Sequence, residues 1–268
     1  MYMGVHVVDS LHAIKVVDTE ISIVKLSGGT YQSETGSEDV CQLQLPFLAE
    51  GVSVEDVQSY CARPPINPDA PFSYDPDLTV FTLYLEVIGD DLPFAILVII
   101  PVSTIYATIE RIRYCTSSLR SPSSPMLVPW DDWGSDGARL VLLPAKSLGS
   151  FENISTLGSR VALTVSLWEL DTDENQCEVA IFDVRRGLDG LGRQESSDVG
   201  ALGPSDLVWV SDCYAPGDTR IFRDPVHTRM PYRVSRGKFS ARELSRADLG
   251  INVGLIHDGI VNLWEPED

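Results

Sequence analysis

Positive charge is scarce in this sequence. Among its 268 residues, 20 lysines and arginines stand against 39 aspartates and glutamates, giving a formal net charge of −19. Nucleic acids and anionic membrane surfaces are bound chiefly through Lys and Arg. The charge balance therefore argues against a general nucleic-acid binder and against a protein that docks on an anionic lipid surface.

Cysteine and histidine are also few. The five cysteines are widely spaced and odd in number, with no C-x-x-C pair, and the four histidines include no H-E-x-x-H motif. An odd set of dispersed cysteines favours free thiols in a reducing compartment over a disulfide framework. The first residues also lack a basic stretch followed by an apolar one, so we expect no signal peptide. We predict a cytoplasmic or nuclear protein without a metal or cofactor.

A long apolar run is missing as well. Leu92–Ile109 has no charged residue, but Pro93 and Pro101 interrupt it, and its continuous apolar part is only Phe94–Ile100. A membrane-spanning helix needs about 20 consecutive apolar residues, whereas a run of this length suits a buried strand. The sequence therefore predicts a buried strand and no membrane association.

What the sequence does contain is the pattern of β-strands. Thr79–Ile88 is β-branched and aromatic, and a polar turn separates it from the strand at Phe94–Ile100. A second hairpin joins Arg160–Leu170 to Glu178–Asp183. Shorter strands are predicted at Ala138–Leu143, Leu207–Val210, Thr219–Phe222, Asn252–Ile256 and Ile260–Trp264.

Helical periodicity is limited to two short segments, Val54–Cys61 and Ser240–Leu249. The chain is predicted to form one domain over residues 1–268. Its long polar loops are expected at Ser27–Asp39, Arg63–Asp77, Thr116–Pro125 and Arg185–Ser205.

Similar strand ends recur along the chain at multiples of about 41 residues, and Asp18, Asp183 and Glu265 mark three of them. A period of about 40–45 residues with several strands in each repeat is typical of propeller blades. We therefore predict an all-β fold, a WD-like β-propeller of about five to seven blades that is truncated or irregular. A large β-sandwich is the alternative.

Several motifs carry a family resemblance. His257–Glu265 resembles the closing hairpin of a WD-repeat blade, in which a D-G turn leads into a strand that ends in Trp and an acidic residue. Val128–Gly134, Gly158–Val161 and Met230–Arg233 resemble segments of the propeller-like part of basidiomycete F-box-associated proteins. The resemblance spans roughly residues 79–265.

This resemblance implies a fungal protein in which the propeller holds a client for a cullin–RING ubiquitin ligase. An F-box would dock such a protein onto the ligase, but residues 1–60 have a strand-like pattern and no F-box is evident there. The predicted function is thus a non-enzymatic protein-interaction scaffold, and the resemblance implies ubiquitin-ligase components among its partners.

One segment reverses the charge of the chain. Between residues 220 and 246, eight basic residues face only Asp224 and Glu243. Arginine forms bidentate hydrogen bonds with carboxylates and phosphates. One reading is that these side chains bind acidic loops of the same chain or are simply solvated. The other is a patch for an acidic or phosphorylated protein partner, formed by Arg223, Arg229, Arg233 and Arg236.

A tryptophan–aspartate cluster at Trp130–Asp136 allows two further interpretations. Paired carboxylates and aromatic faces can act on sugars, so a carbohydrate-active or other small-molecule enzyme is the alternative function. In the structural interpretation, a tryptophan fills the core while the aspartates shape a turn. We assign no catalytic residue, and we place Trp130 and Trp133 with the arginines as candidate partner-binding residues.

Overall fold

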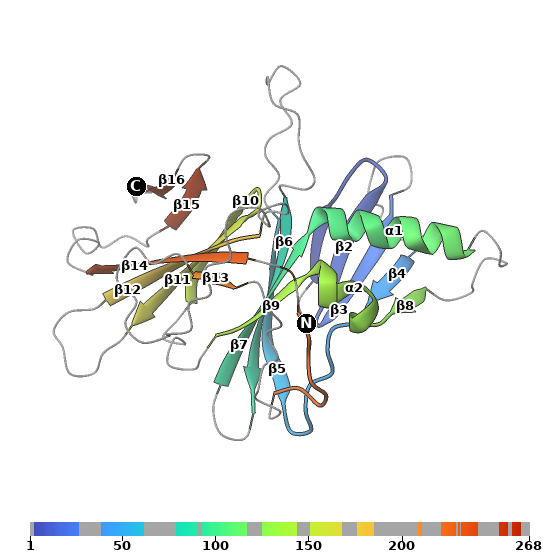
Figure 1. Ribbon diagram of the computed structural model, residues 1–268, viewed down its shortest axis with the longest axis horizontal. Helices are drawn as coiled ribbons and strands as arrows, with labels where there is room; N and C mark the ends of the chain where they lie inside the picture. Colours follow the sequence, from blue (N-terminus) through green and yellow to red (C-terminus); the bar gives the residue numbers. More distant parts are fainter. Residues whose placement is uncertain are drawn as a thin grey trace, which may run out of the picture.

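The computed structural model describes residues 3–26, 39–61, 79–89, 93–116, 125–143, 151–167, 176–184, 208–210, 221–228, 230, 232–240, 252–256 and 259–263. Most of these residues lie in β-strands, and most neighbouring strands run antiparallel (Figure 1). The β-rich class predicted from the strand patterns is therefore confirmed. The predicted loops lie almost wholly outside the described residues, as does most of the helix predicted at Ser240–Leu249.

The first sheet is an antiparallel meander with one added parallel strand. Its spatial order is β1-β2-β3-β4-β8, and β8 pairs with β4 in parallel. A tight turn joins β2 to β3, and Asp18 in that turn has a φ of 50°, a conformation that Asp tolerates better than most residues. The strands are β1 (Met3–Val7), β2 (His12–Val17), β3 (Glu20–Lys25), β4 (Asp39–Leu43) and β8 (Met126–Val128).

The central sheet is antiparallel and is buried on both faces. Its order is β5-β6-β7-β9, formed by β5 (Ser53–Tyr60), β6 (Val80–Ile88), β7 (Pro93–Pro101) and β9 (Arg139–Leu143). Along β6, Leu83 and Leu85 join one hydrophobic cluster, while Val80 and Tyr84 join another on the opposite face. Burial on both faces explains the nearly continuous apolar runs of β6 and β7, which lack a solvent-facing polar position on every second residue.

The third sheet has the order β10-β11-β12-β14-β13, and a separate hairpin joins β15 to β16. Gly158, with a φ of 58°, lies in the turn from β10 to β11, where a positive φ favours glycine. The elements are β10 (Phe151–Leu157), β11 (Arg160–Leu167), β12 (Gln176–Asp183), β13 (Val208–Val210), β14 (Tyr232–Ser240), β15 (Asn252–Ile256) and β16 (Gly259–Leu263).

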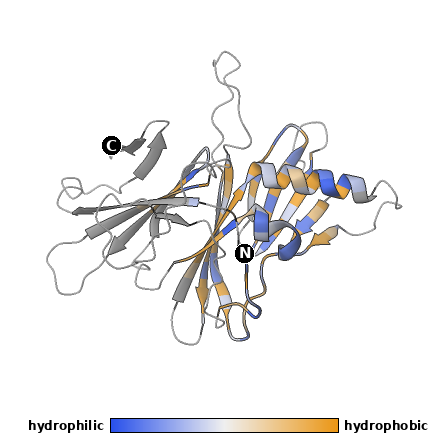
Figure 2. Cartoon of the chain, viewed as in Figure 1, coloured by the Kyte–Doolittle hydropathy of each residue, from blue (hydrophilic) through white to orange (hydrophobic). Residues whose placement is uncertain are grey.

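Two helices complete the described fold, α1 (Val102–Thr116) and α2 (Trp130–Gly137). The sequence analysis missed α1, which begins directly after β7. Ile105, Ile109 and Ile112 share one helix face and join the cluster formed by the first and central sheets. Figure 1 shows α1 lying across the first sheet. Figure 2 shows hydrophobic residues along the strands of the first and central sheets and along α1.

One predicted helix is wrong. Val54–Cys61 forms most of strand β5, which pairs with β6 from Ser53 to Tyr60. Cross-strand pairing with a strongly apolar strand overrides the weak helical pattern of a short segment. The strand predicted at Thr219–Phe222 is reduced, in its described part, to a single bridge between Leu48 and Phe222.

The three sheets stack face to face, with the central sheet between the other two, but the described residues show no closed propeller. The central and third sheets each draw their strands from a stretch roughly twice the predicted period of about 41 residues. Each interval of about 41 residues therefore corresponds to about one hairpin, and two such intervals together form one sheet.

Candidate functional site

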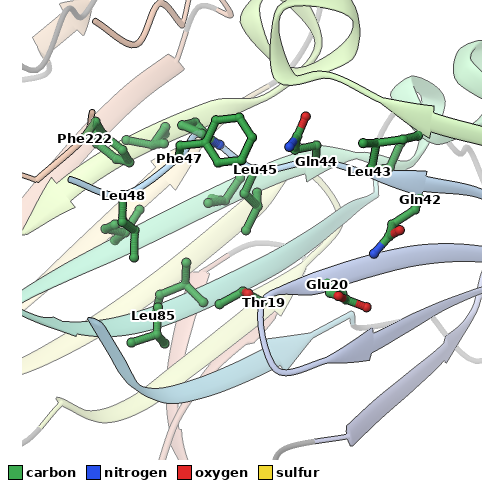
Figure 3. Close-up of a pocket in the computed structure, with 16 residues that line it drawn as sticks. Thr19, Glu20, Gln42, Leu43, Gln44, Leu45, Phe47, Leu48, Leu85 and Phe222 are labelled. Carbon is green, nitrogen blue, oxygen red and sulfur yellow. The ribbon is translucent and has the colours of Figure 1, made fainter. Parts of the chain in front are cut away.

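A cavity of about 380 Å³ lies between the first and central sheets, beside the connection from β4 to β5 (Figure 3). Its floor is aliphatic and is contributed by the central sheet. Leu85 pairs with Ile96 across β6 and β7, and Val98 pairs with Leu140 across β7 and β9. These four residues are at most 4% exposed, so the floor of the cavity is built from buried residues of the core.

Several hydrogen bonds fix the wall of the cavity. Residues 43–48 leave β4 and cross the edge of the cavity, where the Gln44 N–H donates to the Val128 carbonyl at 2.9 Å. Phe222 packs into the same wall and forms the bridge to Leu48. The Arg223 N–H donates to the Phe47 carbonyl at 2.9 Å. These backbone hydrogen bonds tie the wall to β8 and to the segment at residues 222–223.

The mouth combines exposed apolar and polar side chains. Phe47 and Leu127 are 51% and 52% exposed, unusual values for such large apolar residues at a cavity edge. Thr19 and Glu20 stand on the β2–β3 turn, across the cavity from Phe47 in Figure 3. Of the cavity-lining residues that the structure describes, Glu20 alone is ionisable. The site can thus enclose an apolar group of a ligand, while the Glu20 carboxylate faces the part of the ligand that remains outside the cavity.

Arg223 is the predicted binding residue that the structure places nearest to this cavity. Its guanidinium carbon lies 4.4 Å from the centroid of the Phe47 ring, within the range of a cation–π contact. Its Nε also donates to Asp224 at 3.2 Å. Both members of this ion pair are exposed. Arg223 therefore orients an aromatic residue of the mouth and is itself partly neutralised.

The other predicted arginines cannot be related to Arg223 from the described part of the chain. Arg229 lies outside the described residues. Arg233 and Arg236 are both in β14, where the structure describes the backbone and its pairing but not these side chains. In the register, Arg233 stands opposite Asp183, a carboxylate that also accepts from Arg160 at 3.3 Å. A single arginine patch stays a prediction.

Trp130 and Trp133 need a correction, because the structure buries both. They are 6% and 4% exposed, and their rings meet edge to face with centroids 5.0 Å apart. Each indole N–H donates at 3.1 Å to a backbone carbonyl, that of His227 for Trp130 and that of Gln44 for Trp133. The expectation that these rings present a binding surface therefore fails, since they fill the core beneath α2.

The neighbouring aspartates have a structural explanation too. Asp131 and Asp132 occupy the first turn of α2, where a negative charge interacts favourably with the helix dipole. Neither they nor Asp136 line the cavity. The Trp130–Asp136 segment thus offers exposed carboxylates without the aromatic platform that the enzyme interpretation required.

A serine–histidine contact was not predictable from the sequence. The His6 Nε2 lies 2.7 Å from the Ser59 Oγ, joining β1 to β5 across 53 sequence positions. Burial lowers the pKa of His6, so the neutral imidazole is favoured. No described carboxylate orients the ring, which packs edge-on against Phe81, and the pair does not line the cavity. It acts as a link between two sheets.

Arg139 is a second feature that the sequence did not signal. It is 1% exposed, and its Nη1 donates at 3.2 Å to the carbonyls of Thr228 and Met230. Its guanidinium carbon also lies 4.1 Å above the centre of the Tyr232 ring. This arginine fastens the segment before β14 to the central sheet.

Within the described ranges, no three His, Cys, Asp or Glu side chains are grouped so as to hold a metal ion. Neither described helix has the length and apolarity needed to cross a membrane. Comparisons of the chain with family models, with curated proteins and with solved structures found no match.

Proposed function

We propose that this protein is a non-catalytic interaction scaffold that recognises its partner by enclosing one of the partner's large apolar side chains. The observation that supports this function is the aliphatic cavity whose mouth carries the half-exposed Phe47 and Leu127. Interfaces commonly concentrate their binding energy in a few apolar or aromatic anchors that fill pockets of this kind.

The size and lining of the cavity suit such an anchor. An apolar cavity of about 150 Å³ accommodates benzene, so one of about 380 Å³ has room for a Leu or Phe side chain. Full burial of such a side chain contributes about 1.5–3 kcal/mol. The exposed ring of Phe47 and side chain of Leu127 would cover the entering group and exclude water around it.

The lining favours binding over catalysis. General acid–base or nucleophilic chemistry needs at least two groups in hydrogen-bonding reach of one another and of the substrate. Among the described residues that line the cavity, Glu20 is the only ionisable one, and it stands at the exposed mouth. The alternative enzyme function at Trp130–Asp136 loses its main support, since both tryptophans are buried there.

An irregular WD-like propeller is part of the same proposal. Neighbouring propeller blades are antiparallel sheets that stack face to face, and the three stacked sheets are compatible with this arrangement. A role as the client-binding part of a fungal ubiquitin-ligase adaptor rests on the sequence resemblance described above.

The test compares two matched surface substitutions. Leu127→Glu places a charge at the mouth, whereas Leu11→Glu changes an equally exposed leucine (51%) that does not line the cavity. A charge forced against an apolar anchor should weaken capture at least about tenfold. We expect quantitative affinity capture from fungal cytosol to give a discrete partner set with wild type and Leu11→Glu only.

A second variant tests the cavity from within. Val98→Phe fills the floor without altering the surface, so it should abolish the same partner set while the unfolding midpoint stays near that of wild type. If wild type captures no discrete set, or if Leu127→Glu and Val98→Phe retain it in full, the proposed function is wrong.

A further inference from the structure

We propose that the segment bound by the cavity carries a lysine or arginine next to its apolar anchor, and that Glu20 binds this basic side chain. The proposal rests on the scaffold function above and adds the chemistry by which the partner is selected. It requires a carboxylate at the mouth that is not already used, and a position from which a residue flanking the anchor can reach it.

Glu20 meets the first requirement. It lines the cavity and is exposed, and its carboxylate has neither a hydrogen bond nor an ion pair in the described structure. The same is true of the side chains of Gln42 and Gln44 at the cavity wall, which also form no described hydrogen bond. The mouth therefore offers one negative charge and two amides whose hydrogen-bonding capacity is unused.

The opposite side of the mouth does not offer an equivalent positive charge. Arg223 stacks on Phe47 and is paired with Asp224, so an incoming carboxylate would have to compete with an existing partner. The chain as a whole carries a net charge of −19, which attracts cationic segments and repels anionic ones over longer distances. Local and global charge thus favour the same sign of partner.

The position of Glu20 meets the second requirement. It begins β3 directly after the β2–β3 turn, and Figure 3 shows it beside Thr19 at the edge of the cavity, away from Phe47 and Phe222. An anchor inserted over Leu85 leaves its own backbone at the mouth. Because Glu20 itself lines the cavity, a basic side chain next to the anchor would enter the mouth on the same side as this carboxylate.

Three capped dipeptides isolate the charge: acetyl-Lys-Phe-amide, acetyl-Gln-Phe-amide and acetyl-Glu-Phe-amide. Their dissociation constants would be measured by NMR titration of the full chain at low ionic strength. We expect the lysine peptide to bind about fivefold more tightly than the glutamine peptide, the scale of an exposed ion pair, and the glutamate peptide to bind most weakly. The preference should shrink as salt is added.

Two charge variants attribute the preference to its source. Glu20→Gln should abolish it and leave binding of the glutamine peptide unchanged. Glu55→Gln also removes one formal negative charge, but from an exposed position on β5 that does not line the cavity. This variant should keep the full preference for the lysine peptide. An equal loss in both variants would assign the effect to net charge and overturn the proposal.

The outcomes separate this inference from the function on which it rests. Equal binding of all three peptides, abolished by Val98→Phe, would overturn the basic-residue proposal and leave the apolar anchor supported. Absence of binding by every peptide would overturn both. Phenethylamine serves as a further arm, because tighter binding of this free amine than of the lysine peptide would point to a small-molecule ligand and contradict a protein segment.

Discussion

The face of the central sheet that meets the first sheet is almost wholly aliphatic, whereas the opposite face includes Thr82, Tyr84 and Arg139 among its buried residues. On the aliphatic face, leucine, isoleucine and valine side chains pack without directional constraints, and a volume of about 380 Å³ is left unfilled. On the other face, hydrogen bonds and a ring contact hold the side chains of Tyr84 and Arg139.

This difference indicates which face can serve recognition. An unfilled apolar volume weakens a core, but it can be occupied by a ligand without breaking any hydrogen bond. A face with buried polar groups tolerates few substitutions, because a buried polar group that loses its hydrogen-bond partner lowers the stability of the fold. We therefore expect substitutions on the two faces to differ in their effects on stability.

The largest effect should come from Arg139→Ala on the polar face. It would leave a cavity and remove the donor from two buried carbonyls, those of Thr228 and Met230. We expect the free energy of unfolding in urea to fall by about 3–5 kcal/mol. The matched control is Arg160→Ala, whose half-buried side chain pairs with Asp183 and should cost about 1 kcal/mol.

Equal losses in the two arginine variants would break the comparison, because Arg139 would then contribute no more than an ordinary ion pair. A loss confined to Arg139→Ala would show that the polar face depends on the segment running from residue 221 to β14. That segment also carries Phe222 and Arg223, so the same variant should loosen the wall of the cavity.

Strand patterns predicted much of this fold, because buried strands are recognisable in the sequence as β-branched and apolar runs. The hairpins around β6 and β7 and around β11 and β12 were predicted from β-branched and apolar runs. The helix α1 was not predicted. The uncharged stretch that precedes it continues into its first turns, and this hides the change from the two-residue period of a strand to the 3.6-residue period of a helix. β5 was mistaken for a helix because its pairing with β6 is a long-range property.

The candidate site was harder to predict than the fold. Arg223 was singled out by local charge, and its guanidinium group lies against Phe47 of the mouth, although Arg223 is not among the described lining residues. The floor residue Leu140 and the mouth residue Leu127 come from elements that meet only in three dimensions, so no spacing in the sequence joins them. Trp130 and Trp133 attracted notice as aromatics, but their burial depends on carbonyls from distant segments.

A one-methylene change on each face sharpens the comparison on a smaller scale. Val98→Ile extends a side chain into the cavity, whereas Val80→Ile extends one into the packed opposite face, and both valines are 1% exposed. We expect Val98→Ile to raise the free energy of unfolding by up to about 0.8 kcal/mol. Val80→Ile should lower it by about 1 kcal/mol through overpacking.

Thermal or urea unfolding of both variants measures this difference directly. Stabilisation by Val80→Ile together with destabilisation by Val98→Ile would reverse the comparison. It would also remove the argument that the volume beneath Phe47 is available to an anchor from a partner.

The smallest effects concern pH, and they assign one limb of the stability profile to each face. Burial lowers the pKa of His6, which packs on Phe81 at the aliphatic face. The unfolded chain then binds a proton more readily, so the contribution of His6 is complete above about pH 6.5 and declines as the pH falls below it. Replacing the imidazole in His6→Phe should flatten only this acid limb.

Tyr84 governs the other limb. Burial, and then the negative charge of Glu86, raise the pKa of its hydroxyl far above the usual value for tyrosine of about 10. The unfolded chain loses the proton first, so stability is complete below about pH 10 and declines at higher pH. Tyr84→Phe should flatten this alkaline decline and leave the acid limb unchanged in urea unfolding at a series of pH values. If each variant altered both the acid and the alkaline limb, the titration of His6 and that of Tyr84 would be coupled. The difference between the aliphatic face and the polar face would then not extend to their titratable groups.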